Sequence, residues 1–210
     1  MTHPARSPAS SARRPRSPRG EGDRLRDDLL DAAAELMAEK GELDAISLRA
    51  IAGRAGVSPT AVYRHFDDHL HLLREAVERC WSQFAEHLRR GAVGHDDPYD
   101  RLRGAGDAYV DFAMSEPGKY RVLFSNRIDL EMEQIMAGGV AFDLLVELLT
   151  AVLRDRGDVR DPHLVAVLVH TWIHGIVDLC GNHEHKGWPD VPTLLDHLGD
   201  RLGLTRPPAG

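Results

Sequence analysis

The stretch SLRAIAGRAGVSPTAVYRHF, from Ser47 to Phe66, decides the fold of this chain. Its first four apolar residues have the i, i+3, i+4, i+7 spacing of one buried helix face: Leu48, Ile51, Ala52 and Ala55. Val62 and Phe66 form a second, shorter face with i, i+4 spacing. The residues between the two faces, AGVS at positions 55–58, have the length that joins two helices at a steep angle. The pattern therefore predicts a helix-turn-helix.

The ends of both predicted helices carry residues that helix termini favour. Ser47 and Ser58 each stand where a hydroxyl can accept a hydrogen bond from an unpaired backbone N–H of the first turn. Pro59 takes the first position of the second helix, where its missing N–H costs nothing. Val57, before the cap, and Val62, within the helix, are spaced as a hydrophobic staple. These end signals support the two-helix interpretation.

The same run resembles the N-terminal DNA-binding domain of the TetR family of bacterial transcriptional regulators. The residues that carry the resemblance lie within about positions 24–75 and are Leu29-Leu30-Asp31-Ala32-Ala33, Leu36-Met37, Gly41, Ser47-Leu48, Ile51-Ala52, Ala55-Gly56-Val57-Ser58, Val62-Tyr63-Arg64-His65-Phe66 and Leu72-Leu73. The resemblance implies a homodimeric regulator that binds a double-stranded DNA operator in a sequence-specific way. It also implies a repressor that a small molecule releases from that operator.

Composition bears on the class of protein and on its location. At 210 residues and 42% hydrophobic, the chain can bury one or two cores without disulfides or metals. Cys80 and Cys180 stand far apart in the sequence and form no disulfide framework, so a reducing cytoplasm is the expected location. No run is expected to reach the roughly 18 to 20 apolar residues of a membrane span. The first residues lack the apolar core of a secretory signal.

Helical spacing recurs along the whole chain and alternating strand patterns are absent, so the predicted fold is all-α with about nine or ten helices. Residues 23–68 are expected to form a three-helix helix-turn-helix DNA-binding domain. Residues 69–204 are expected to form a helical domain for effector binding and dimerisation, followed by a loose tail at 205–210. Residues 1–22 hold five arginines and one acid among prolines, which predicts a disordered basic arm. That arm either lies along DNA or is a solvated tail.

Helix geometry gives the first expected DNA contacts. With Val62 and Phe66 turned inward, the outward or flanking residues of the second helix are Thr60, Ala61, Tyr63 and Arg64. Thr60 and Ala61 suit contacts with thymine methyl groups. Arg64 suits a guanine in the major groove.

The resemblance implies the remaining contacts. It makes Tyr63 and His65 phosphate contacts and places Arg49 near a base or a phosphate at the start of the first helix. Ser47 and Ser58 can add phosphate hydrogen bonds from their capping positions. The complete predicted set is Ser47, Arg49, Ser58, Pro59, Thr60, Ala61, Tyr63, Arg64, His65 and His69.

Two positions near this set leave alternatives open. Proteins of the resembled family commonly carry a lysine at the position of His69, followed by a polar residue, and that lysine contacts a phosphate. Here Leu70 follows His69, so the contact is either lost or depends on the histidine being charged. Arg54 is either a DNA contact or a solvent-facing charge.

Charge supports the DNA-binding interpretation. Residues 47–66 hold three arginines and no acidic residue, within a chain of formal net charge -7. An acidic body with one basic edge should present that edge to DNA. Because one copy offers few phosphate contacts, a dimer is expected, with its recognition helices about 34 to 36 Å apart, one turn of DNA.

Two apolar stripes near the C-terminus are the expected dimer interface. The residues of the first stripe are Val165, Leu168, Val169, Trp172 and Ile176. The residues of the second stripe are Leu194, Leu195, Leu198 and Leu202. The resemblance implies that the last two helices pair with their copies in a four-helix bundle. The alternative is that these residues are the buried core of one monomer.

An effector cavity is expected from the resemblance, with a mostly apolar small molecule as its ligand. The candidate lining residues are Trp81, Phe84, Tyr109, Phe112, Tyr120, Phe124, Met136, Trp172 and His174. Aromatic residues at helical spacing are also typical of ordinary core, which is the alternative. The segment HTWIHG at positions 170–175 is similar to the Trp-x-His-Gly signature of one TetR C-terminal class.

Histidines near the C-terminus raise a different possibility. His170 and His174 stand at i and i+4, which puts two imidazoles on one helix face, and His183, Glu184 and His185 follow. A metal- or redox-responsive regulator is therefore one alternative. Neither a cysteine-rich nor a His-Glu-x-x-His pattern is present, so no metal, other cofactor or catalytic residue is predicted. A helical interaction protein with a purely structural helix-turn-helix is the other alternative.

Overall fold

The fold was obtained as a computed structural model, which describes residues 21–124, 132–182 and 188–206. Within those residues, nine α-helices and one short 3₁₀ helix make up the regular secondary structure. The predicted all-α class is therefore confirmed. Most of the predicted basic arm, residues 1–20, lies outside the described residues, and the first helix begins at Glu21, two residues before the expected position.

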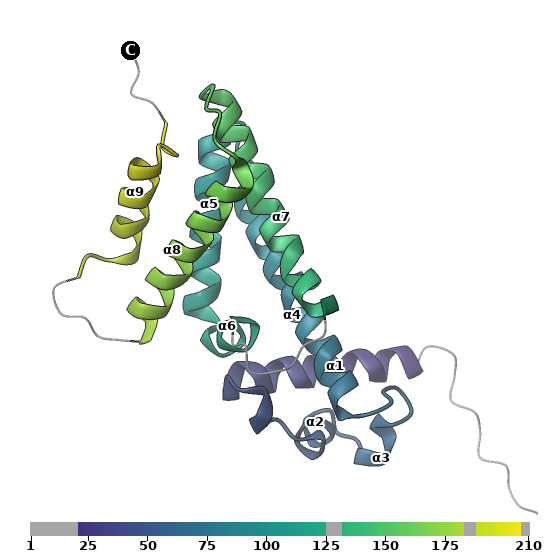
Figure 1. Ribbon diagram of the computed structural model, residues 1–210. Coiled ribbons are helices and arrows are strands. Elements are labelled where there is room, and N and C mark those ends of the chain that lie inside the picture. The colour runs from purple at the N-terminus through teal and green to yellow at the C-terminus, as the bar shows by residue number, and fades with distance from the viewer. Residues whose placement is uncertain (1–20, 125–131, 183–187, 207–210) are drawn as a thin grey trace, which may run out of the picture.

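The N-terminal domain is built around the first helix. Its elements are α1 (Glu21–Lys40), η1 (Leu43–Ala45), α2 (Leu48–Arg54) and α3 (Pro59–Val62). One face of α1 is fully buried at Leu29, Ala33 and Met37. Figure 1 shows α2 and α3 side by side at the end of the molecule, below α1. The helix-turn-helix is thus held on the outside of the molecule by the helix that precedes it.

The body of the molecule consists of six helices. They are α4 (His69–Ala92), α5 (Pro98–Ser115), α6 (Pro117–Phe124), α7 (Met132–Asp155), α8 (Pro162–Asn182) and α9 (Val191–Leu202). Helix α4 starts beside the helix-turn-helix and runs up into the body, where it packs against α5 and α7 (Figure 1). A single cluster of buried apolar side chains extends from α1 to α8. The two predicted domains therefore share one continuous core.

Aspartate and serine side chains fix several helix starts. The Ser47 hydroxyl accepts a hydrogen bond from the Ala50 N–H (3.2 Å), as predicted for the cap of α2. Asp68 caps α4 and Asp190 caps α9 in the same way, by accepting from N–H groups three residues later. Ser58 has the extended backbone of a cap, but its side chain makes no capping hydrogen bond. The predicted position of that cap is correct, but its hydroxyl does not supply the bond.

Helices α4 and α5 cross at a pair of glycines. A Cβ atom added to Gly104 would lie 2.1 Å from the carbonyl oxygen of Gly91, and one added to Gly91 would lie 2.4 Å from the carbonyl oxygen of Gly104. No side chain larger than hydrogen fits at either position without moving a backbone. The close approach of the two helices therefore depends on glycine at both positions.

The eighth helix is unusually apolar. Residues 162–180 have a mean hydropathy of 1.5, and by length and composition α8 could cross a membrane, which corrects the expectation that no run is long enough. Only 22% of that stretch is buried inside the monomer. A core helix of a monomer would be mostly buried, so α8 presents an apolar face that the described residues of its own chain do not cover.

The two cysteines have different environments. Cys80 is buried, and its Sγ lies 3.9 Å from the Sδ of Met37, joining α4 to α1. Burial raises the pKa of the Cys80 thiol to about 11, so the reactive thiolate is scarce at neutral pH. Cys180 on α8 is partly exposed. A redox-sensing role for Cys80 is therefore disfavoured.

Candidate nucleic-acid interface and ligand cavity

The outer side of α3 and the turn after it form the exposed face of the helix-turn-helix. Val62 and Phe66 are buried against the N-terminal core, at 0% and 2% exposure. Thr60, Tyr63 and Arg64 are exposed, and Tyr63 is 57% exposed. The buried pair thus turns the predicted base-contacting side chains towards solvent.

Helix α3 is shorter than the apolar pattern indicates. It ends at Val62, and residues 63–65 form turns instead of continuing the helix to Phe66 as expected. The Arg64 and His65 N–H groups donate to carbonyls three residues back, and the Phe66 N–H still reaches the Val62 oxygen at 3.1 Å. The chain therefore tightens after one turn while keeping Val62 and Phe66 on one side.

The other predicted contact residues surround this face. Ser47, Arg49, Ser58 and Pro59 are exposed, whereas Ala61 and His65 are partly buried. The hydroxyl oxygen of Ser47 already accepts a hydrogen bond from the Ala50 N–H, and its O–H group can donate a hydrogen bond to a phosphate oxygen. The face contains hydroxyl, guanidinium and backbone N–H groups and no acidic side chain, which suits a polyanion.

Arg54 is held by the first helix. Its guanidinium makes ion pairs with Glu35 (3.0 Å) and Glu39 (2.8 Å), both on α1. The hydrogen bond from Arg54 lowers the pKa of the Glu39 carboxyl. Arg54 is therefore neither a free solvent-facing charge nor an available DNA contact. It fixes the C-terminal end of α2 to α1.

His69 does not present its outer nitrogen to solvent. The residue opens α4, and its Nε2 atom is buried, with no hydrogen-bond partner among the described residues. A phosphate contact through that nitrogen would need a different rotamer. The phosphate contact of His69 therefore stays a prediction, and it requires this change of rotamer.

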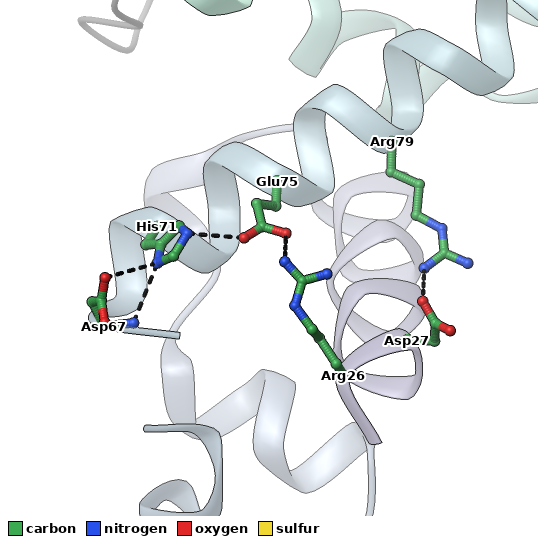
Figure 2. A network of polar contacts seen from close by, with 6 residues as sticks. All are labelled: Arg26, Asp27, Asp67, His71, Glu75 and Arg79. Carbon is green, nitrogen blue, oxygen red and sulfur yellow. Dashed lines mark hydrogen bonds and ion pairs between the residues drawn. The ribbon is translucent and has the colours of Figure 1, made fainter. Parts of the chain in front are cut away.

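A polar network that the sequence analysis missed fixes the start of α4. Figure 2 shows Glu75 between Arg26 and His71, and Arg26 reaches it from α1 to form an ion pair. His71 contacts the Asp67 N–H (3.3 Å) and carboxylate (3.5 Å) through Nδ1, and the Glu75 carboxylate through Nε2 (2.9 Å). The Arg26 guanidinium also lies over the Phe66 ring, 5.1 Å from its centre. The network thus connects α1, α4 and the loop after α3.

A second connection lies one turn further along α4. Arg79 contacts Asp27 (3.2 Å) and Asp31 (3.3 Å) on α1, as the right side of Figure 2 shows for Asp27. The i, i+4, i+8 spacing of His71, Glu75 and Arg79 on one helix face was the available signal in the sequence. Together the two groups fix α4 on α1, so a displacement of α4 would reposition the helix-turn-helix.

The described residues of the body line a partly open cavity of about 630 Å³. Four of the candidate lining residues stand in its wall: Trp81, Phe84, Tyr109 and Phe124. Helices α4, α5, α6, α7, α8 and α9 all contribute to the lining. Most of the lining side chains are aliphatic or aromatic. The cavity therefore has the size and character of a site for a small apolar molecule.

The remaining candidates stand elsewhere. Phe112, Tyr120 and His174 pack behind the wall: Phe112 against Phe84, and Tyr120 against His174. Trp172 is 51% exposed on α8 and is not part of the lining, which corrects its assignment to the cavity. The side chain of Met136 lies outside the described residues. The sequence analysis missed His170, Arg103 and Asp196, all of which line the cavity.

The predicted dimer stripes divide between core and surface. Val165 and Leu198 are buried inside the monomer, which corrects their assignment to an interface. Val169, Ile176, Leu194, Leu195 and Leu202 are partly buried. Leu168 and Trp172 are exposed, and they belong to an apolar stripe along α8, here called the α8 face: Leu164, Val167, Leu168, Trp172 and Leu179. This face is shifted around the helix from the predicted stripe.

Metal ligands do not gather in the described part of the chain. Within it, no group of three or more histidine, cysteine, aspartate or glutamate side chains is arranged to hold a metal ion. His183, Glu184 and His185, which motivated the metal alternative, lie outside the described residues. His170 and His174 are instead stacked on each other, with ring planes 10° apart.

Two family models match the chain in the regions that these features occupy. Residues 29–76 match the model described as bacterial regulatory proteins, tetR family. Residues 102–202 match the model described as tetracyclin repressor-like, C-terminal domain. The chain belongs to the TetR family. The predicted resemblance is thus confirmed for both the helix-turn-helix and the body.

Curated relatives match over part of their length. The transcriptional activator FasR of Mycolicibacterium smegmatis is 34% identical over 104 residues, which are 50% of this chain and 47% of FasR. The transcriptional repressor KstR of Mycobacterium tuberculosis is 38% identical over 74 residues, 35% of this chain and 33% of KstR. The chain therefore aligns with about half, or less, of the length of these relatives.

The whole fold has close counterparts among solved structures. A protein of unknown function from Rhodococcus sp. RHA1 superposes with a TM-score of 0.73 at 27% identity, covering 87% of this chain and 96% of that one. This TetR-family chain therefore has the same helical arrangement from the helix-turn-helix through the body.

Proposed function

We propose that this TetR-family chain is a homodimeric, cytoplasmic repressor that binds an operator through α3 and leaves it when a small apolar molecule fills the cavity. The observation that carries the proposal is the pairing of two features. An acid-free face with exposed Tyr63 and Arg64 stands at one end of α4, and the walls of a 630 Å³ cavity include the middle of the same helix. The relative KstR is a transcriptional repressor, which supports repression, whereas the relative FasR is a transcriptional activator, which supports the opposite direction of control.

Dimerisation is proposed through the α8 face. Its large apolar side chains are exposed in the part of the monomer that the structure describes, and a second copy would cover them with the same apolar surface. A two-fold dimer also presents two copies of α3 to DNA. Two half-sites about 34 to 36 Å apart would then be bound together.

Leu168→Asp and Trp172→Asp are expected to convert the dimer to monomers. Each substitution places two unpaired carboxylates in an apolar interface, one per copy, which costs several kcal/mol and raises the dimer Kd by about a hundredfold or more. Light scattering coupled to size exclusion at micromolar concentration measures the change. Val159→Asp is the matched control, because Val159 is 98% exposed in the connection before α8. A dimer that survives both α8 substitutions would place the interface elsewhere.

Two helices connect the cavity with the helix-turn-helix. Helix α4 lines the cavity with Trp81 and Phe84 and holds α1 through Glu75 and Arg79. Helix α6 places Phe124 in the cavity wall, while a Cβ at Gly118 would lie 1.9 Å from the Ala38 carbonyl oxygen of α1. A ligand that prefers one arrangement of these helices would shift the population towards it. To lower the operator-bound arrangement from about 99% to about 1% of the population, the ligand must bind the released arrangement roughly 10⁴-fold more tightly than the operator-bound one.

Footprinting of the protein on the DNA upstream of its own gene tests the proposal. We expect protection over two half-sites one helical turn apart, with an affinity that falls steeply as salt rises because arginines displace counterions from phosphates. A reporter placed behind the protected site distinguishes repression from activation. Absence of any protected site, or protection that is independent of salt, would count against the operator-binding role.

A further inference from the structure

The cavity has an apolar middle and two polar ends. Its middle is lined by Trp81, Phe84, Leu88, Leu144 and Leu148. Along α5 the lining extends from Tyr99 to Tyr109, which corresponds to about 15 Å at the rise of an α-helix. The cavity is therefore elongated, and a ligand that fills it is apolar along most of its length.

The inner end carries a chain of hydrogen bonds. The Tyr109 and Tyr120 hydroxyls are 3.0 Å apart, and the Tyr120 hydroxyl lies 2.6 Å from Nδ1 of His174. Burial raises the pKa of both tyrosines, that of Tyr120 to about 12, so both phenols stay protonated. Only Tyr109 of these three residues lines the cavity. These hydrogen-bonded residues thus present one neutral hydroxyl, that of Tyr109, to a ligand, with Tyr120 and His174 behind it.

His170 stands beside the ring of Tyr109. It lines the cavity, its ring meets the Tyr109 ring edge-on at 6.5 Å, and no hydrogen bond joins it to another described residue. Burial, and then the neighbouring His174, lower the pKa of His170, so its imidazole is neutral at pH 7. A neutral imidazole offers one N–H donor and one nitrogen acceptor. His170 therefore has unused hydrogen-bonding capacity that matches an uncharged oxygen.

The outer end is charged but already compensated. Arg103 contacts Asp107 (2.9 Å) and Asp196, and Arg206 contacts Asp97 (3.0 Å) and Asp100 (2.8 Å). Each arginine thus faces two aspartates, and acidic groups outnumber basic ones. A carboxylate or phosphate on the ligand would have to displace an aspartate from an arginine or remain unpaired. This end disfavours an anionic ligand.

We propose that the cavity selects an uncharged, elongated apolar molecule whose terminal hydroxyl or carbonyl oxygen binds between His170 and Tyr109. The identity of this cavity as the effector site rests on the proposed function, whereas the selectivity for an uncharged ligand does not. An alcohol is the best match, because it can donate to the free imidazole nitrogen and accept from the N–H or from Tyr109.

Decanol and decanoate are the probes, because they share one apolar chain and differ in the charge of the head group. Calorimetric titration of the full-length protein at pH 8, below the micellar concentration, is expected to show decanol binding at least tenfold more tightly than decanoate. His170→Leu should weaken decanol binding about tenfold, and Tyr109→Phe severalfold, because each removes a neutral hydrogen-bonding group. His163→Leu, on the same helix but outside the lining, should leave binding unchanged.

The variants also need an independent measure of folding. Tyr109→Phe removes only one hydroxyl and is expected to leave the core intact. It therefore still tests the inference if His170→Leu lowers the thermal midpoint. Three results would overturn the inference. Decanoate binds as tightly as decanol or more tightly, neither probe binds, or both folded variants bind decanol as the parent does. Operator affinity is measured separately: selective decanol binding that leaves it unchanged supports the inference and contradicts release by ligand.

Discussion

Alanine at Tyr63 or Arg64 is expected to weaken operator binding by about a hundredfold or more without unfolding the protein. A base or phosphate contact is worth about 1 to 3 kcal/mol, and a dimer loses two of them with each substitution. Both side chains are exposed, so the free energy of unfolding should change by less than about 0.5 kcal/mol. Fluorescence anisotropy with labelled operator and thermal unfolding measure the two quantities.

Arg54→Ala is the matched control for Arg64→Ala. Both residues are arginines of the helix-turn-helix, but the Arg54 guanidinium is occupied by Glu35 and Glu39 on α1. Its loss should lower the thermal midpoint slightly and leave most of the operator affinity. If the two arginine variants lose affinity equally, or if Tyr63→Ala binds like the parent, the contact face is not the one that α3 presents.

Gly104→Ala is expected to destabilise the body by about 1 to 2 kcal/mol. The added methyl group would overlap the Gly91 carbonyl oxygen at 2.1 Å, and this atom belongs to a helix backbone that cannot rotate away. Overpacking of this kind costs about 1 to 3 kcal/mol, and separation of α4 from α5 also loosens the cavity wall. Alanine gains back only up to about 1 kcal/mol in helix propensity. Urea unfolding followed by circular dichroism gives the difference.

Gly106→Ala is the control for the same helix. A Cβ at Gly106 meets no atom within 4 Å, so only the propensity gain remains and stability should rise by about 0.5 to 1 kcal/mol. The two substitutions are chemically identical and lie two residues apart on α5. A fall in stability for both, or a rise for both, would mean that the contact between Gly91 and Gly104 does not set the spacing of α4 and α5.

Local patterns predicted the helix-turn-helix well. The spacing of Ile51, Ala52, Val62 and Phe66 indicated their burial, and all four are buried. Ser47 caps α2 as predicted because a cap depends only on residues three positions away. The family resemblance followed from local motifs within about positions 24–75, and the all-α class followed from helical spacing along the whole chain.

Features that depend on distant residues were less predictable. Arg54 could not be assigned because its partners precede it by 19 and 15 residues on another helix. Apolar residues lie on several sides of α8, so periodicity alone could not tell that Val165 faces the core and Leu168 faces solvent. The cavity has walls from six helices, so His170, which the sequence offered only as a possible metal ligand, was recognised as a lining residue only once those helices were in place.

The contact between Gly118 and Ala38 has a mechanical consequence. Where side chains separate two helices, a small displacement of one can be absorbed by rotamer changes before the other moves. At Gly118 no side chain lies between the two helices, because the α6 backbone lies directly on the α1 backbone at Ala38. Phe124, on the same short helix, lies in the cavity wall. A small shift of α6 at Gly118, such as one that follows a displacement of Phe124, is therefore expected to move α1 directly, without a side-chain rearrangement between the two helices.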